Sequence, residues 1–256
     1  MEKQSILERI KTARLQRFLT NCYSLNVVEH CTRVWAQGDE FLFSYEDHGI
    51  DRLVFFARSW QAVDRLLAEV KEGQYCLEFM TKDPDEYAPE GFALTAALKR
   101  LANPDCGNVF DAGSPLLQYK DAAIVETAKE QDAGVINELL WSTFHTEVSH
   151  LLSDDELREK IKAGQITIHR DEDDHIDALL QAEVLPKKFY INQIVNRGER
   201  KVIHAVLLDR LEKYTKAGGK YMYAWVEERN IASMKFHGKY GMEHDGMWNM
   251  VYCSKR

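Results

Sequence analysis

Residues 225–248, WVEERNIASMKFHGKYGMEHDGMW, bring together side chains that could carry out chemistry at helical spacing. Asn230 offers a carboxamide that donates and accepts hydrogen bonds, and His237 has an imidazole that exchanges protons near neutral pH. Tyr240 adds a phenolic hydroxyl, another common proton donor in catalysis. Each also has a structural explanation, because asparagine caps helices and Phe236 and Tyr240, four residues apart, form an apolar stripe. These residues can act on a substrate only if the surrounding elements bring one to this helix.

The second half of the chain alternates between strand and helix patterns. The predicted strands are 121–128, 165–170, 176–184, 188–195, 220–228 and 247–253, and the predicted helices are 129–145, 153–164, 199–219 and 230–240. Ser153 followed by Glu156 forms a capping-box pattern, and Gly218-Gly219 ends the longest helix. Interleaved strands and helices predict an α/β or α+β fold with a mixed sheet.

The first half has a similar order. The predicted elements are a helix at 4–18, strands at 40–47 and 51–58, a helix at 59–73, a strand at 74–82 and a helix at 89–103. His48-Gly49 joins the two strands, and Ser59 is a plausible N-cap. Residues 103–120 have prolines and glycines without a clear period, so we expect two domains, 1–115 and 116–256.

Composition limits the classes of function. The chain has 256 residues with 33 basic and 41 acidic side chains, so the net charge is −8. This balance disfavours a nucleic-acid partner. No apolar run reaches membrane-spanning length, and the charged start does not resemble a secretory signal, so no membrane role is expected. Five scattered cysteines without metal-site spacing favour a reducing, cytoplasmic environment.

The strand, turn, long helix and strand before residue 230, followed by FHGKYGM, resemble the GNAT superfamily of N-acetyltransferases. The final motif of that superfamily reads roughly N-x-x-A/S-x-x-(F/L)-(Y/H)-x-x-x-G-F. The matching residues here are Asn230, Ser233, Phe236, His237 and Gly241, with Met242 in place of the usual phenylalanine. The resemblance covers residues 121–253 and implies a GNAT-like mixed sheet flanked by helices. The first half resembles a partial, degenerate second copy, as in tandem GNAT proteins.

The resemblance implies a site for acetyl-CoA as acyl donor. Two parallel strands, near 189–195 and 220–226, would splay apart and hold the pantetheine arm, and the next helix would bind the pyrophosphate at its N-terminus. Asn230 would bond the arm. The residues implied to contact the cofactor are Ile194, Val195, Arg197, Arg200, Lys201, Val202, Ile203, His204, Asn230 and Ser233.

One segment departs from the family pattern. The GNAT pyrophosphate loop resembles Q/R-x-x-G-x-G/A, where glycines let the backbone approach phosphate. Val202 and His204 occupy the glycine positions in one alignment, and in another only Gly198 survives. We expect crowding by these side chains to weaken CoA binding, while Arg197, Arg200 and Lys201 could supply positive charge, or simply form a solvated helix start.

For catalysis, the resemblance implies that His237 is the general acid, with Tyr240 and Tyr252 as substitutes. Glu183 is the candidate base, ahead of Glu126, although the sequence favours a simpler explanation, in which both carboxylates are charges at the rim of the site. The cluster of residues 145–150 has histidines five apart, which does not fit a helical metal site, so no metal is expected. That stretch is expected to shape the acceptor pocket.

These observations favour an N-acetyltransferase that moves an acetyl or other acyl group to a primary amine of a small molecule or peptide. Two alternatives remain open: a GNAT-fold binding protein with little or no activity, and a tandem-GNAT aminoacyl transferase that takes its acyl group from charged tRNA. The acidic net charge disfavours the second alternative. Both a monomer and a dimer are compatible with the sequence.

Overall fold

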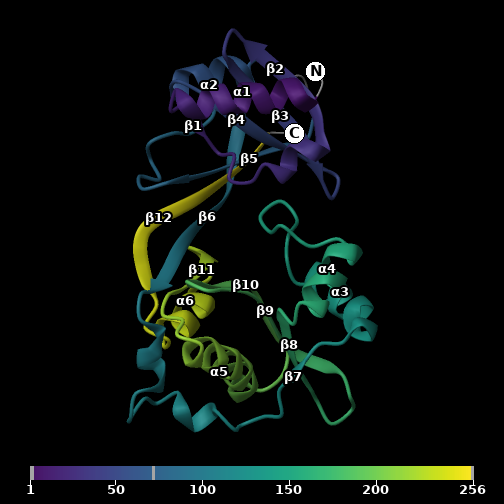
Figure 1. Cartoon of the computed structure of the whole chain (residues 1–256), viewed down its shortest axis with the longest axis vertical. Helices are drawn as coiled ribbons and strands as arrows, with labels where there is room; N and C mark the ends of the chain where they lie inside the picture. Colours follow the sequence, from purple (N-terminus) through teal and green to yellow (C-terminus); the bar gives the residue numbers. More distant parts are fainter. Residues whose placement is uncertain (1–2, 71–72, 255–256) are drawn as a thin grey trace. The chain divides into compact units, whose positions relative to one another are not determined.

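The computed structural model describes residues 3–70 and 73–254, and Figure 1 labels their helices and strands. The chain forms two compact units. Unit 1 consists of Met1–Ala97, Thr146–His150 and Met247–Arg256, and unit 2 consists of Leu98–His145 and Leu151–Gly246. Residue 115, the expected boundary, lies in the irregular stretch of unit 2. The mixed α/β class predicted from the alternating patterns is confirmed.

The described residues of unit 1 form two α-helices and a run of neighbouring strands. Its elements are α1 (Lys3–Leu15), β1 (Leu19–Thr20), η1 (Asn26–His30), β2 (Cys31–Gln37), β3 (Glu40–Asp47), β4 (Ile50–Ala57), α2 (Trp60–Leu67) and β5 (Tyr75–Thr81), together with part of β12 (Glu243–Ser254). The strand order is β2-β3-β4-β5-β12, with β1 paired to β4. Only β4 and β5 are parallel.

Local sequence explains much of unit 1. His48 and Gly49 both have positive φ, 53° and 82°, the backbone that a two-residue hairpin between right-twisted strands requires. Ser59 caps α2 by accepting a hydrogen bond from the Ala62 backbone N–H. The apolar face of α2 packs against β3, β4 and β5 in one core cluster, and α1 packs on the other face of the sheet in a second cluster.

Unit 2 is built around a longer helix. Its elements are part of β6 (Phe92–Asn103), η2 (Cys106–Phe110), η3 (Leu117–Tyr119), β7 (Glu126–Thr127), η4 (Glu130–Asp132), α3 (Ala133–Trp141), α4 (Asp154–Lys162), β8 (Ile166–Arg170), β9 (Ile176–Leu185), β10 (Lys188–Asn196), α5 (Arg200–Lys216), β11 (Met222–Glu227), α6 (Ile231–Gly238) and the start of β12. The strand order is β6-β11-β10-β9-β8-β7. Again only one pair, β10 and β11, is parallel.

Helices cover both faces of the unit 2 sheet. α5 buries a broad apolar face, including Leu207 and Leu211, against one face, and α6 contributes Met234 and Phe236 to the same core cluster. α3 and α4 lie side by side and cover the opposite face near β8 and β9. The predicted capping box is confirmed, because Ser153 and Glu156 each bond the backbone N–H of the other.

Three strands, β1, β2 and β6, differ from the sequence predictions. The predicted helix at 89–103 is wrong, since Phe92–Asn103 is strand β6. Its alanines and leucines favour a helix locally, but pairing places Leu101 opposite Ala224 in the core, and this tertiary contact outweighs propensity. Strand β2 was missed because its burial pattern lacks a regular alternation.

The cysteines are also not all free. Cys76 on β5 and Cys253 on β12 are directly opposite each other and form a disulfide, whereas Cys22, Cys31 and Cys106 are free thiols. The expectation of uniformly reduced cysteines is therefore wrong for this pair, whose residues are 177 positions apart and cannot be matched by spacing. Within residues 3–70 and 73–254, no helix is both long and apolar enough to cross a membrane.

Candidate functional site

The two parallel strands of unit 2 separate part-way along their length. β10 and β11 are paired over only three residue pairs, the last being Ile191 opposite Ala224. Beyond that point β10 remains paired with β9 as far as Asn196, and β11 remains paired with β6 as far as Glu227. The facing edges of the two strands therefore carry backbone groups that neither strand satisfies for the other.

A β-bulge marks the point of separation. The register of β10 against β9 shifts between Ile191 and Gln193, so Asn192 is an extra residue. Ile191, before the bulge, and Ile194, after it, both pack in the core cluster of α5. Residues three apart on a regular strand point to opposite faces, so the bulge reverses which alternate side chains point towards α5. The side-chain oxygens of Asn192, Gln193 and Gln181 are buried here without a hydrogen-bond partner among the described residues. These three carboxamide oxygens are acceptors that a donor from a ligand or water could use.

The helix after β10 offers an anion-binding end. Glu199 precedes α5 but its side chain caps no backbone group, and the backbone N–H groups of Arg200 and Lys201 have no partner within the described parts of the chain. These free donors lie at the positive end of a 17-residue helix dipole. The side chains of Arg197, Arg200 and Lys201 are exposed around the same turn. This arrangement can hold phosphate.

The side chains expected to crowd this turn point into the core instead. Val202, Ile203 and His204 are buried, His204 completely. The His204 ring stacks on Tyr119 and Phe236, with ring centroids 4.7 and 4.9 Å apart, respectively. Burial, with the charges of nearby lysine and arginine, lowers the pKa of His204 to about 4, so its imidazole is neutral.

The turn before α5 does require its one glycine. The backbone N–H groups of Arg197 and Gly198 both donate to the Asp177 carbonyl, at 2.6 and 3.3 Å. A Cβ at Gly198 would stand 2.0 Å from the Asp177 carboxylate. That carboxylate accepts a hydrogen bond from His169, and a second carboxylate at the turn, Glu199, forms an ion pair with Lys201 at 3.0 Å.

Asn230 has the capping role expected of its position. Its side-chain oxygen accepts a hydrogen bond from the Ser233 backbone N–H at 3.0 Å, which leaves its amide N–H groups exposed and unused by the cap. Gly241 follows α6 with φ 68°, and an added Cβ would lie 3.0 Å from the Asn103 amide nitrogen. The start and end of α6 are thus both fixed by the residues that the motif singled out.

His237 is buried, and its ring is hydrogen-bonded within its own helix. Its Nδ1 donates to the Ser233 carbonyl at 2.8 Å, so the ring proton resides on Nδ1, and Nε2 is buried with no partner in the described residues. The side chain is 4% exposed, and burial lowers its pKa, opposed by the bond to Ser233. The ring is therefore neutral at pH 7, with a bare Nε2 that can accept a proton or a hydrogen bond.

Tyr240 is fully buried and bonds to a residue that sequence reasoning did not pair with it. Its hydroxyl lies 2.8 Å from His204 Nδ1, and burial raises its pKa. The pair links the first turns of α5 to the end of α6. A buried tyrosine hydroxyl needs a polar partner. His204 is a polar residue within an apolar helical run, and this feature of the sequence could have identified it as the partner of Tyr240.

Glu183 lies on the opposite face of the sheet from these residues. It stands beside Gln181 on β9 and directly opposite Tyr190, and its carboxylate forms an ion pair with Lys160 of α4 at 2.6 Å. Among the described residues it makes no contact with His237 or Tyr240.

The lower-ranked catalytic candidates are occupied elsewhere. Glu126 forms an ion pair with Arg170 at 2.9 Å at the sheet edge. Tyr252 belongs to unit 1, where its hydroxyl donates to the Tyr87 carbonyl at 3.2 Å.

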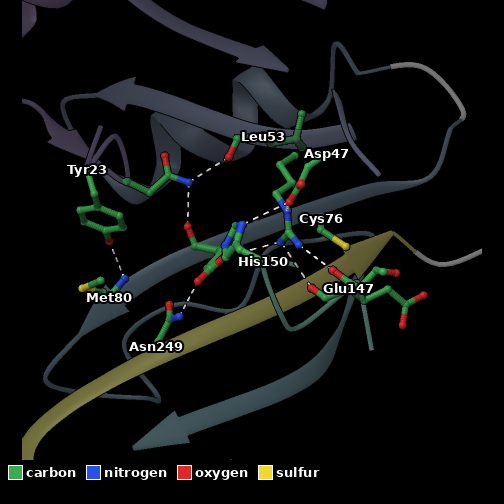
Figure 2. A network of polar contacts seen from close by, with 12 residues as sticks. Tyr23, Asp47, Leu53, Cys76, Met80, Glu147, His150 and Asn249 are labelled. Atoms are coloured by element: carbon green, nitrogen blue, oxygen red, sulfur yellow. Dashed lines mark hydrogen bonds and ion pairs between the residues drawn. The ribbon is translucent and has the colours of Figure 1, made fainter. Parts of the chain in front are cut away.

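A second polar cluster lies in unit 1 and is shown in Figure 2. His150 donates to Asp47 at 3.2 Å and to Glu78 at 2.8 Å, and since both partners are carboxylates, both ring nitrogens carry protons. Arg52 forms ion pairs with the same two carboxylates. Asn249 donates to Glu78.

The charges in this cluster balance. Loss of solvent opposes protonation of His150, but the charge of Glu78 and the two hydrogen bonds outweigh it and raise the pKa to about 9. Burial would raise the pKa of Asp47 and of Glu78, yet His150 and Arg52 lower both to about 2. The pKa values of His150, Asp47 and Glu78 are thus all displaced away from 7, which favours a structural role for the cluster.

The cluster fixes a segment that we expected at the acceptor pocket. Arg52 donates to the carbonyls of Thr146 and Glu147, at 2.6 and 3.4 Å, and His150 ends the same segment. Thr146–His150 therefore belongs to unit 1, although unit 2 precedes and follows it in the sequence.

No family model matches the sequence, and no curated protein matches it, but solved structures share its fold. A GCN5-related N-acetyltransferase from Sphaerobacter thermophilus is 12% identical with a TM-score of 0.56, covering 84% of this chain and 76% of that chain. A tandem GNAT protein from the clavulanic acid biosynthesis pathway is 12% identical with a TM-score of 0.54, covering 84% and 78%. The structure of L-PGS from Bacillus licheniformis is 11% identical with a TM-score of 0.50, covering 97% and 91%.

At these identities the likeness concerns the fold. Both units place a single parallel pair with a connecting helix, β4-α2-β5 and β10-α5-β11, in the same position within the strand order. Each unit also takes the strand next to that pair, β12 or β6, from the other half of the sequence. The chain has the fold of the GNAT N-acetyltransferases, with a second and reduced copy in unit 1.

Proposed function

We propose that this protein is an N-acyltransferase that binds acetyl-CoA, or a related acyl-CoA, in unit 2 and transfers the acyl group to a primary amine. The observation that carries the proposal is the separation of β10 from β11 after Ile191 and Ala224. An extended chain of secondary amides fits between two such edges, because each amide can bond the unpaired backbone groups.

The residues at the starts of α5 and α6 suit the pyrophosphate and the pantetheine arm of the acyl donor. The free N–H groups of Arg200 and Lys201 and the cationic side chains around them would hold the pyrophosphate. The unused amide of Asn230 would bond the arm. Because Val202 and His204 turn inward, the missing glycines do not leave side chains over the turn.

When bound, acyl-CoA would supply an activated acyl thioester. Glu183 would take the proton that the acceptor amine must lose, directly or through water, and its pairing with Lys160 would hold the carboxylate in place. Gln181 and Gln193 would orient the acceptor, since their oxygens are free to accept from an ammonium or amine. We propose that His237 offers Nε2 as a hydrogen-bond acceptor near the opening, and that Tyr240 positions α6 through His204.

A binding protein without turnover is the second candidate. The enclosure of His237 and Tyr240, which leaves no exposed acid on α6, is the observation that favours it. Aminoacyl transfer from charged tRNA would use the same fold with a different donor. The acidic net charge of −8 counts against a large polyanionic partner.

Ligand stabilisation followed by a turnover assay distinguishes these candidates. Acetyl-CoA at 100 times its Kd should stabilise the fold by about 2.7 kcal/mol. Release of free CoA thiol should then depend on an amine from a panel of alkylamines, amino acids and peptides. Stabilisation without turnover supports the binding protein, and no stabilisation at millimolar acetyl-CoA contradicts acyl-CoA use.

We also propose a cytoplasmic location, which a thiol count on protein taken directly from cells would test. The Cys76–Cys253 bond leaves three free thiols of five. Five free thiols in protein taken directly from cells would mean that the Cys76–Cys253 bond forms only after lysis, as a reducing compartment requires, whereas three would mean that it forms in the cell and would contradict a cytoplasmic location.

A further inference from the structure

The parallel pair of unit 1 separates in the same way as the pair of unit 2. β4 and β5 are paired over three residue pairs that end at Leu53 opposite Leu77. β4 then continues to Ala57 and β5 to Thr81. Unit 1 therefore contains the same kind of opening between strand edges that unit 2 has beyond Ile191 and Ala224.

The opening in unit 1 is filled by a side chain of the protein itself. The Asn21 amide nitrogen donates to the Leu53 carbonyl of β4 at 2.9 Å and to the Glu78 carbonyl of β5 at 2.7 Å. Its oxygen accepts from the Phe55 backbone N–H of β4 at 2.8 Å. Asn21 is only 8% exposed, so one buried carboxamide bridges both separated strands.

The residues on either side of Asn21 complete the filling. Leu19 and Thr20 pair with the end of β4 at Ala57 and Phe56. Because β3 is paired with the other edge of β4, this pairing lies on the edge that β5 has left. On the far strand, the Tyr23 hydroxyl accepts the Met80 backbone N–H at 2.8 Å, as Figure 2 shows.

The helix next to this opening has a side-chain cap that α5 lacks. Ser59 accepts the Ala62 N–H at the start of α2, whereas the corresponding residue before α5, Glu199, caps nothing. Among the described residues, unit 1 thus satisfies internally the strand edges that unit 2 leaves free, and it caps α2 with Ser59.

We infer that residues Leu19–Tyr23 are an internal plug that closes the unit 1 opening to acyl-CoA, so that each chain has one donor site, in unit 2. The part that concerns unit 2 rests on the proposed function, and the plug itself rests on the contacts of Asn21 and Tyr23. The contacts of the plug also show which hydrogen bonds an occupant of such an opening can make. A single amide that donates to carbonyls on both strands and accepts one N–H does in unit 1 what the amides of a bound arm would do in unit 2.

Backbone hydrogen exchange tests the plug without any ligand. In the full chain, Asn21→Ala should speed exchange of the Phe55 N–H by about tenfold or more, because that buried donor loses its acceptor. Tyr23→Phe removes only a hydroxyl from an exposed side chain, so it should fold normally and speed exchange at Met80 alone. Asn26→Ala is the control, since Asn26 is exposed three residues after the plug, at the start of η1, and its side chain makes no hydrogen bond among the described residues. Unchanged exchange at Met80 in the Tyr23 variant would overturn the plug.

Calorimetric titration of the wild-type chain with acetyl-CoA tests the number of sites. One equivalent bound supports the inference, and two equivalents overturn it. No binding at all would contradict the proposed acyl-CoA site in unit 2, while the exchange result would still decide whether Leu19–Tyr23 closes unit 1.

Discussion

Ile191 and Ala224 are the last directly paired residues of two parallel strands that go on, separately, for five and three more residues. Over that length β10 stays paired with β9, and β11 stays paired with β6, so the separation is not caused by fraying of the strand ends. The extra residue Asn192 gives it a physical cause, because a bulge bends its strand and increases its twist.

The cationic turn before α5 should dominate the electrostatics of donor binding. Replacing Arg200 and Lys201 together by alanine should weaken acetyl-CoA binding about tenfold or more at low salt, because two charges near the phosphates are lost. Titrations at several salt concentrations should show a shallower salt dependence in the variant. Lys216→Ala, at the other end of the same helix, is the matched control and should change neither quantity. Equal affinities for the double variant and the wild type would place the phosphates elsewhere.

Asn230 should have two separable roles. Asn230→Ser keeps an N-cap oxygen but removes the amide, so the free energy of unfolding should change by only a few tenths of a kcal/mol while acetyl-CoA affinity falls about fivefold. Asn230→Ala should lose about 1 kcal/mol of stability in addition. Chemical denaturation and calorimetry measure the two effects. A serine variant with unchanged affinity would reduce Asn230 to a cap.

Replacing Gln193 should stabilise the protein and impair its function. Its side-chain oxygen is buried without a partner, so Gln193→Met should raise the free energy of unfolding by about 1 kcal/mol. If this carboxamide orients the acceptor, the acceptor KM should rise while acetyl-CoA affinity stays the same. Steady-state kinetics with the best amine of the panel, together with denaturation, checks both. Lower stability with an unchanged acceptor KM would mean that Gln193 is merely structural.

Features of the fold that depend on contacts between neighbouring residues could be predicted from the sequence. The hairpin at His48-Gly49 and the caps at Ser59 and Ser153 are local, so a few neighbouring residues determine them, and these predictions are confirmed. The order of elements in unit 2 followed from periodicity for the same reason.

The features that were missed join distant parts of the chain. Asn21 reaches Glu78, His204 reaches Tyr240, and His150 reaches Asp47, across 57, 36 and 103 residues. No local pattern encodes such partners. Strand β6 was taken for a helix because its alanine-rich sequence has helical propensity and the strand that overrides it, β11, lies more than a hundred residues later.

His150 should make stability depend on pH in the alkaline range. Its folded-state pKa of about 9 lies above the ordinary value of 6.5, so its contribution is fully present below pH 6.5 and is lost as the pH rises through 9. The wild type should therefore be more stable than His150→Gln at pH 6, and the difference should shrink towards pH 10. Denaturation curves across this range measure it. His175→Gln, at a residue whose side chain is 78% exposed in a turn, should show no comparable trend.

That comparison also has a clear contrary outcome. A difference between wild type and His150→Gln that is constant from pH 6 to pH 10 would mean that the ring is not held as an imidazolium between Asp47 and Glu78.

Hydrogen exchange of the wild-type chain with and without acetyl-CoA tests the central claim most directly. If the opening between β10 and β11 holds the donor, backbone amides in residues 192–196 and 225–229 should become protected when acetyl-CoA is added, and those around Phe55 and Met80 in unit 1 should not change. Protection confined to other segments, or none at saturating acetyl-CoA, would contradict the account.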